Sequence, residues 1–450
     1  MIGKARPMPE SLLGRMFANV AWLLGGKTFG AICSLAYLAI LTRSLGLKDF
    51  GHFSLIFGAS QALIAVAGFQ TWRVVVRYGV GHVHKQEWDA FGRLGLMAGA
   101  IDALGAVLGT VVAYIAIYQF GDVLDINPEL SDIAFWFVVA ALWALVSAPT
   151  GIVRALDRFD MAVYVEALVP SGRLLGALII WLTGPTLVKF LIVWALVDLI
   201  EAAAYWCMAR YLAPGSINLR NAFQWRSTRQ ENPGITRFFM ITYASATLEA
   251  TMRHGPLLAV GYFVGTSAAG LYRLAHQLAQ GLSKLTNVLT KAAYAEIARA
   301  SVAANVMEFR KLAIQTTKLA GAAGAIVIGL AVAIGGHMLA LLAGEEFRPA
   351  YEVLIPLTVA ACFELGSVAF EPVLHSSGKA RNALASRLVA VCAMLAALFL
   401  VVEKGGGPAA AWSVALGGAV HYLVMGAMAW LTLRRLAREN SGEDSAQISR

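Results

Sequence analysis

Charged and amide side chains recur along one face of an otherwise apolar segment at residues 267–288. Arg273, Gln277, Gln280 and Lys284 follow one another at intervals of three or four residues, so on a helix they form a single stripe. Such a stripe suits an anionic, hydroxylated molecule, because guanidinium groups pair with phosphate oxygens and amides with hydroxyl groups. Alternatively, Lys284 only extends its ammonium group to the boundary of a membrane.

Other apolar segments also contain ionisable residues. Further basic candidates for substrate binding are Lys27, Arg173 and Arg253. Acidic candidates for coupling to protons or sodium ions are Asp198, Glu249, Glu364 and Glu371. Two structural alternatives stay open. Glu249 and Arg253 are spaced for an ion pair within one helix, and the other carboxylates could neutralise the basic residues across helix contacts.

The segments that carry these residues are long enough to cross a bilayer. The chain is 58% hydrophobic and 14% charged, far from the mixture of a soluble domain. About twelve apolar segments reach the roughly 20 residues that a spanning helix needs. They lie at residues 17–41, 50–69, 91–118, 133–153, 161–181, 186–208, 238–264, 267–288, 312–333, 351–374, 382–402 and 409–433. The sequence therefore predicts an all-α, polytopic membrane protein.

The loop charges predict the orientation of these spans. If the N-terminus is inside, 26 lysines and arginines of the loops and tails fall on the inner side and five on the outer side. Basic residues favour the cytoplasmic side, so we expect both termini in the cytoplasm. The net charge of +9 is thus an orientation signal, and we expect no nucleic-acid partner.

Two parts of the sequence resemble each other. Gly46, Gly51 and Leu55 align with Gly265, Gly270 and Leu274 at an offset of 219 residues, and Pro149 and Arg158 align with Pro372 and Arg381 at an offset of 223. We expect two six-helix lobes, at residues 1–212 and 235–436, with a cytoplasmic linker at 213–234 and a tail at 437–450. An even number of spans in each lobe makes the repeats parallel, and two lobes around a central cavity is a transporter architecture.

Several enzyme signatures are absent from the sequence. It contains no phosphate-binding Gly-x-x-x-x-Gly-Lys-[Ser/Thr] loop, no His-Glu-x-x-His motif and no cysteine pair at metal-ligand spacing. The predicted outer loops are short, whereas membrane glycan polymerases and ligases usually need a sizeable one. We therefore expect no enzyme, no catalytic residues, no metal and no cofactor.

Two motifs carry a family resemblance. Residues 41–46 (Leu-Thr-Arg-Ser-Leu-Gly), followed by Asp-Phe-Gly-His-Phe-Ser-Leu at 49–55, resemble the segment that joins the first two spans of the polysaccharide transporter family. Residues 375–382 resemble that family's turn after the tenth span. The family includes the Wzx-type O-antigen flippases and belongs to the multidrug/oligosaccharidyl-lipid/polysaccharide exporters.

This resemblance implies a flippase of the bacterial inner membrane. Its cargo would be undecaprenyl-pyrophosphate-linked oligosaccharide, moved to the periplasmic leaflet by alternating access for the synthesis of surface polysaccharide such as O-antigen. Related lipid II flippases use basic residues on spans one and eight, where Lys27 and Arg273 lie. We expect a monomer that meets membrane lipids and works beside glycan polymerase machinery. A multidrug or cation antiporter of the same superfamily is the alternative, which the acidic candidates keep open.

Overall fold

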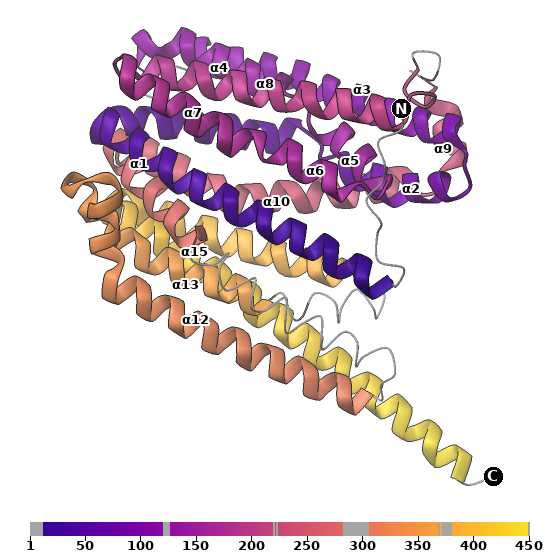
Figure 1. Ribbon diagram of the computed structural model, residues 1–450. Helices are drawn as coiled ribbons and strands as arrows, with labels where there is room; N and C mark the ends of the chain where they lie inside the picture. The colour runs from indigo at the N-terminus through magenta and orange to yellow at the C-terminus, as the bar shows by residue number, and fades with distance from the viewer. Residues whose placement is uncertain are drawn as a thin grey trace. The chain divides into compact units, whose positions relative to one another are not determined.

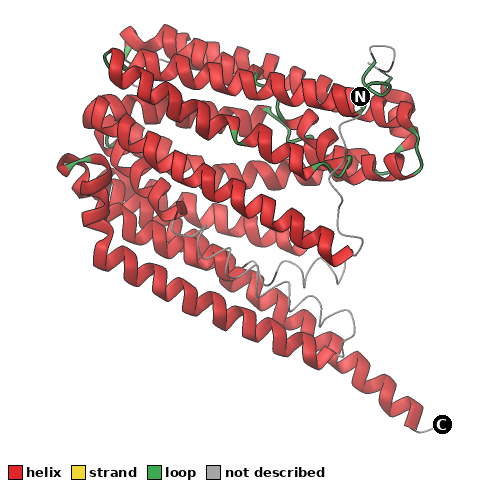
Figure 2. Ribbon diagram, viewed as in Figure 1, coloured by secondary structure: helices red, strands yellow, loops and turns green. Residues whose placement is uncertain are grey.

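The computed structural model is built from helices and their connections. It describes residues 12–119, 127–218, 221, 224–281, 306–367, 370 and 380–448, and these residues contain no strand (Figure 2). The predicted all-α, polytopic membrane fold is therefore confirmed.

The chain forms two compact units. The first comprises Met1–Gly46 and Ile56–Thr247, and the second Leu47–Leu55 and Leu248–Arg450. The unit boundary thus falls inside a helix, whereas the sequence suggested lobes at 1–212 and 235–436. Those lobes, and the cavity between them, remain predictions.

The first unit takes most of α1 and continues to the middle of α10. α4 packs against both α3 and α8 (Figure 1). The elements are α1 (Leu12–Ala67), α2 (Trp72–His84), α3 (Trp88–Tyr114), η1 (Ile115–Gln119), η2 (Pro128–Leu130), α4 (Ser131–Trp143), α5 (Ser147–Ala155), α6 (Phe159–Glu166), α7 (Leu168–Thr183), α8 (Leu187–Leu212), α9 (Trp225–Glu231) and α10 (Ile235–Phe263).

The second unit contains the rest of α10 and the helices that follow. A helix covers residues 266–281, and then come α12 (Val306–Ala343), η4 (Glu345–Ala350), α13 (Tyr351–Ser367) and α15 (Ala380–Ile448). α13 packs against both α12 and α15 (Figure 1).

Seven stretches of the described residues are long and apolar enough to cross a membrane. Two of these, Phe29–Ala67 and Leu384–Leu431, each hold two of the predicted spans. α1 and α15 each consist of two helical segments that meet at a non-helical glycine inside a predicted loop, Gly46 and Gly406 respectively. The predicted spans six and seven coincide with α8 and α10.

The aligned glycines of the predicted repeat share a backbone conformation. Gly46 (φ 69°) and Gly265 (φ 111°) both lie in the left-handed region that favours glycine, and each precedes a helical segment. The next aligned pair, Gly51 and Gly270, meets in the second unit. A Cβ added to Gly270 would lie 3.2 Å from the Cα of Gly51, and one added to Gly51 would collide with the Thr266 carbonyl. Only glycine lets the two helices approach this closely.

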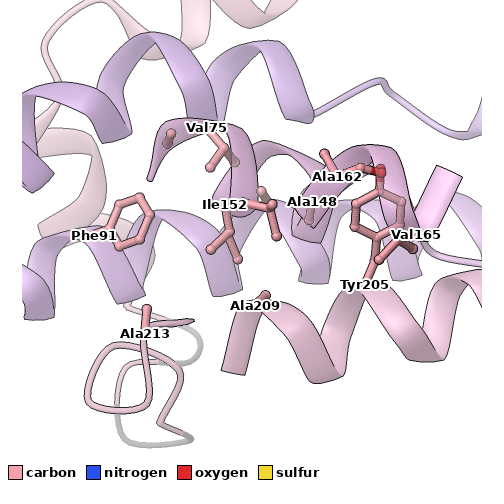
Figure 3. Packing of buried hydrophobic residues seen from close by; sticks show 12 residues of the cluster. Val75, Phe91, Ala148, Ile152, Ala162, Val165, Tyr205, Ala209 and Ala213 are labelled. Carbon is pink, nitrogen blue, oxygen red and sulfur yellow. The ribbon is translucent and has the colours of Figure 1, made fainter. Parts of the chain in front are cut away.

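Apolar side chains of α2, α3, α5, α6 and α8 form the main core of the first unit. Tyr205 and Phe91 are its largest members, and small alanines such as Ala148, Ala162 and Ala209 let the helices approach closely (Figure 3). This packing fixes the positions of α6 and α8, which carry ionisable residues.

Asp102 stabilises a strained turn beside this core. Phe69 and Gln70 both have φ 45°, which is uncommon for residues other than glycine. The hydroxyl of the following Thr71 donates to the Asp102 carboxylate (2.9 and 2.8 Å), and the Ala148 amide donates to it at the start of α5 (2.9 Å). These contacts give Asp102 a structural role.

Candidate functional site

An ion pair joins α7 and α8 inside the first unit. The Arg173 guanidinium donates to Asp198 at 2.7 Å, and both side chains are largely buried (11% and 14% exposed). Arg173 also lies 5.5 Å from the ring centres of both Phe57 and Trp194. Buried charges are stable only when paired, and aromatic faces attract a cation. Arg173 and Asp198 therefore neutralise each other across a helix contact, which is one of the two structural alternatives that the sequence left open.

A second ion pair lies nearby and includes a residue that the sequence reasoning missed. Arg154 of α5 donates to Glu166 of α6 (2.9 Å), and the Tyr205 hydroxyl lies 3.3 Å from the same carboxylate. Glu166 falls within the predicted fifth span, so a census of ionisable residues in spans could have found it.

Glu201 lies between these two pairs. It is one helical turn beyond Asp198 on α8 and is within electrostatic reach of Asp198, Arg173 and Glu166. Both neighbouring arginines already hold another carboxylate. In the described part of the first unit, no ion pair or hydrogen bond satisfies the Glu201 side chain.

Basic side chains gather in the second unit. His276 lies within electrostatic reach of Arg253, Arg273 and His254. Arg273 lies 6.0 Å from the Phe53 ring centre. His276 stacks on Tyr272 (6.2 Å) and is 3.3 Å from the Gln280 amide. His254 was not singled out from the sequence, because it lies outside the stripe.

The predicted stripe occupies the less buried side of its helix. Arg273, Gln277 and Gln280 are partly exposed, whereas the intervening Leu274, Ala275, Leu278 and Ala279 are buried. Lys284 and Glu371 lie outside the described residues. Lys27 lies on α1, but its side chain is not among those described.

Glu249 pairs with a different arginine from the one expected. Its carboxylate accepts from Arg387 of α15 at 3.3 Å, so the predicted ion pair with Arg253 is not formed. Arg253 is exposed, and no ion pair reaches it within the described residues. Ten residues, or about 15 Å of helix, separate it from the end of α10.

Glu364 is exposed on α13. It lies 13 residues, or about 20 Å, beyond the start of that helix, and no described side chain pairs with it. Charged groups at such depth face water or protein because lipid cannot solvate them. Arg253 and Glu364 are thus both exposed and without a described ion pair.

Known proteins resemble this chain in sequence and in fold. No family model matches the sequence. The chain is 26% identical over 346 residues to the inner membrane protein YghQ of Escherichia coli (strain K12), covering 75% of this chain and 94% of that protein. The match supports a multi-pass protein of the bacterial inner membrane.

Solved structures show the same fold. An inward-facing multidrug resistance MATE family transporter of the MOP superfamily matches with a TM-score of 0.69 and 15% identity, over 91% of this chain and 96% of that chain. The lipid II flippase MurJ, inward closed, matches with a TM-score of 0.70 and 10% identity, over 90% of this chain and 86% of that chain. A MOP superfamily transporter from Pyrococcus furiosus, described as having a binding pocket of reverse polarity, has a TM-score of 0.63, with 13% identity over 93% of this chain and 95% of that one. The fold is that of MOP-superfamily transporters. The narrower resemblance to the polysaccharide transporter family stays a prediction.

Proposed function

We propose that the chain is a flippase that moves undecaprenyl-pyrophosphate-linked oligosaccharide from the cytoplasmic to the periplasmic leaflet by alternating access. The observation that carries this proposal is the basic cluster of the second unit, Arg253 and Arg273 with His254 and His276. Arginines at bilayer depth suit a diphosphate, because each can donate two parallel hydrogen bonds to phosphate oxygens. The fold of MurJ, a lipid II flippase, supports the same class of cargo.

Ion coupling is the second part of the proposal. Asp198 and Glu249 are each held by an arginine, so their charge is already compensated. Glu364 and Glu201 have no such partner among the residues that the structure describes. A carboxylate that is free to take up and release a cation is better suited to coupling than one in an ion pair. Glu371 remains a candidate from the sequence alone.

The proposal is tested with purified protein in vesicles that contain a labelled undecaprenyl-pyrophosphate oligosaccharide in the inner leaflet. Loss of one charge-assisted hydrogen bond to phosphate typically costs about 10- to 100-fold in binding. We expect translocation to fall by about that factor in Arg253→Gln and Arg273→Gln. Arg348→Gln, at an exposed arginine of η4, is the matched control and should translocate normally.

A multidrug or cation antiporter of the same superfamily is the second candidate. The exposed Glu364 and the unpaired Glu201 favour it, because a cationic substrate binds carboxylates. Efflux of a fluorescent organic cation, driven by a proton or sodium gradient and abolished by Glu364→Gln, would support the antiporter. Glycan translocation unaffected by Arg253→Gln and Arg273→Gln would overturn the flippase assignment.

A further inference from the structure

The short helix α9, between α8 and α10, has two different faces. Its inward face is fixed by polar contacts with α2 and α3. The His82 ring lies 3.0 Å from the Asn232 side-chain oxygen just beyond α9, and Arg93 donates to Glu231 (3.2 Å). Thr228 and Asn232 are fully or almost fully buried. These contacts hold α9 in a defined orientation.

The opposite face of α9 is aromatic and basic. Trp225 is 42% exposed, and Arg226 and Arg229 are exposed beside it. At about 100° per residue, these three side chains span roughly 100° of the helix surface. Within the described residues neither arginine forms an ion pair, so their charges are available to an external partner.

Exposed aromatic side chains also lie at the start of α3, which packs against α9, and near the end of α8, which precedes α9 in the chain. Trp88 begins α3 and is 43% exposed, and Tyr211 near the end of α8 is 68% exposed. Rings with an apolar body and a polar edge collect at the headgroup level of a bilayer. The loop charges assign the ends that carry Trp88, Tyr211 and Trp225 to the cytoplasm. α9 thus lies at the cytoplasmic headgroup level of the membrane.

We propose that the outward face of α9 binds anionic phospholipid headgroups of the cytoplasmic leaflet. Arg226 and Arg229 donate to the phosphate, and Trp225 inserts between the headgroups. Arginines around a large exposed ring, with further exposed rings at the same level, complement an anionic bilayer surface. An acidic protein partner would match the arginines but would leave the rings at that level without an apolar environment. This binding is independent of the cargo of the proposed transporter.

The test measures lipid retention by the full-length protein. Protein purified from vesicles of phosphatidylcholine and phosphatidylglycerol is analysed by native mass spectrometry for bound lipid. We expect wild type to retain phosphatidylglycerol in preference to phosphatidylcholine. The double variant Arg226→Gln/Arg229→Gln should lose most of that preference, since each basic residue near an anionic surface contributes about five-fold. Trp225→Ala should weaken retention of both lipids.

The control removes the same charge at two residues that the loop charges assign to the outer side of the membrane. Arg348→Gln/Lys404→Gln lowers the net charge equally at two exposed outer residues and should retain phosphatidylglycerol as wild type does. The salt dependence of wild type is an independent readout, because its preference for phosphatidylglycerol must also fall as salt is added. Equal retention of the two lipids by wild type would overturn the proposal, as would equal losses in both double variants. Capture of an acidic protein without lipid preference would assign the face to a protein and overturn it too.

Discussion

Removing one partner of the Arg173–Asp198 pair should destabilise the protein far more than removing both. Each partner holds the other's charge at 2.7 Å between α7 and α8, with little exposure of either side chain. Asp198→Asn removes the carboxylate that the Arg173 guanidinium bonds, and the guanidinium cannot lose its proton. Arg173→Met leaves a carboxylate, which can be neutralised by a proton.

The magnitudes follow from the burial of the pair. Breaking a buried pair from one side costs about 3–5 kcal/mol, whereas replacing both charges by apolar groups of similar size is close to neutral. Arg173→Met additionally loses two cation–π contacts, each 5.5 Å from a ring centre and worth about 0.5–2 kcal/mol. We therefore expect both single variants to lose several kcal/mol and Arg173→Met/Asp198→Leu to recover most of that loss.

Unfolding in mixed micelles, followed by tryptophan fluorescence as the fraction of denaturing detergent rises, measures these differences. The exposed pair Glu345–Arg348, 3.6 Å apart, is the matched control, and each of its single variants should cost less than about 1 kcal/mol. A double Arg173/Asp198 variant as unstable as the sum of its singles would refute the reasoning. Translocation by the stable double variant then decides the role of Arg173. Normal transport makes the pair structural, and lost transport makes Arg173 a binding residue.

Three further predictions follow from other contacts. The hydrogen bond from His82 holds the pKa of Glu87 below its usual value of 4.5. The stabilisation by this hydrogen bond is therefore present above about pH 4.5 and lost as pH falls through the lowered pKa, so Glu87→Gln should reduce the acid sensitivity of thermal unfolding. Gly51→Ala should cost about 1–3 kcal/mol in detergent unfolding because its Cβ meets the Thr266 backbone, whereas Gly329→Ala, in open space, should be neutral or slightly stabilising. Arg253→Gln should leave the free energy of unfolding unchanged while reducing translocation about ten-fold. Arg387→Gln should lower the free energy of unfolding by up to about 1 kcal/mol, because it removes the ion-pair partner of the half-exposed Glu249.

The helices could be predicted from the sequence because hydrophobic length alone identifies a spanning segment. The aligned glycines could also be found from one sequence, because each pair has a structural role. Gly46 and Gly265 are aligned because both positions require positive φ, and Gly51 and Gly270 because their backbones cross closely. What the sequence did not predict is how short these connections are, because the two helical segments of α1 and of α15 meet at a single non-helical glycine where a longer loop was expected. A glycine can end a helix or bend it, and packing decides which.

Partners of the ionisable residues could not be predicted in the same way. Periodicity assigns a residue to a face of its own helix but not to the helix that covers that face. Glu249 illustrates this, because Arg253 is close in sequence while Arg387, 138 residues away, forms the bond. Arg154 and Glu166 escaped notice for a related reason. Arg154 was assigned to a loop and Glu166 was overlooked within a span, and only tertiary packing brings the two together.

The observed pairing separates the charges that hold helices together from those left for transport. Arg173 and Arg387 are each occupied by a carboxylate, so neither presents a full positive charge to a diphosphate. Arg253 is exposed and has no described ion pair, and a second arginine, Arg273, acts on the same histidines and would raise the local affinity for anions. The carboxylates differ in the same way, because Asp198 is bonded to an arginine whereas Glu201 has no described ion pair. Within the proposed flippase, cargo binding therefore rests on Arg253 and Arg273 more than on Arg173, and coupling rests on Glu201 and Glu364 more than on Asp198 and Glu249.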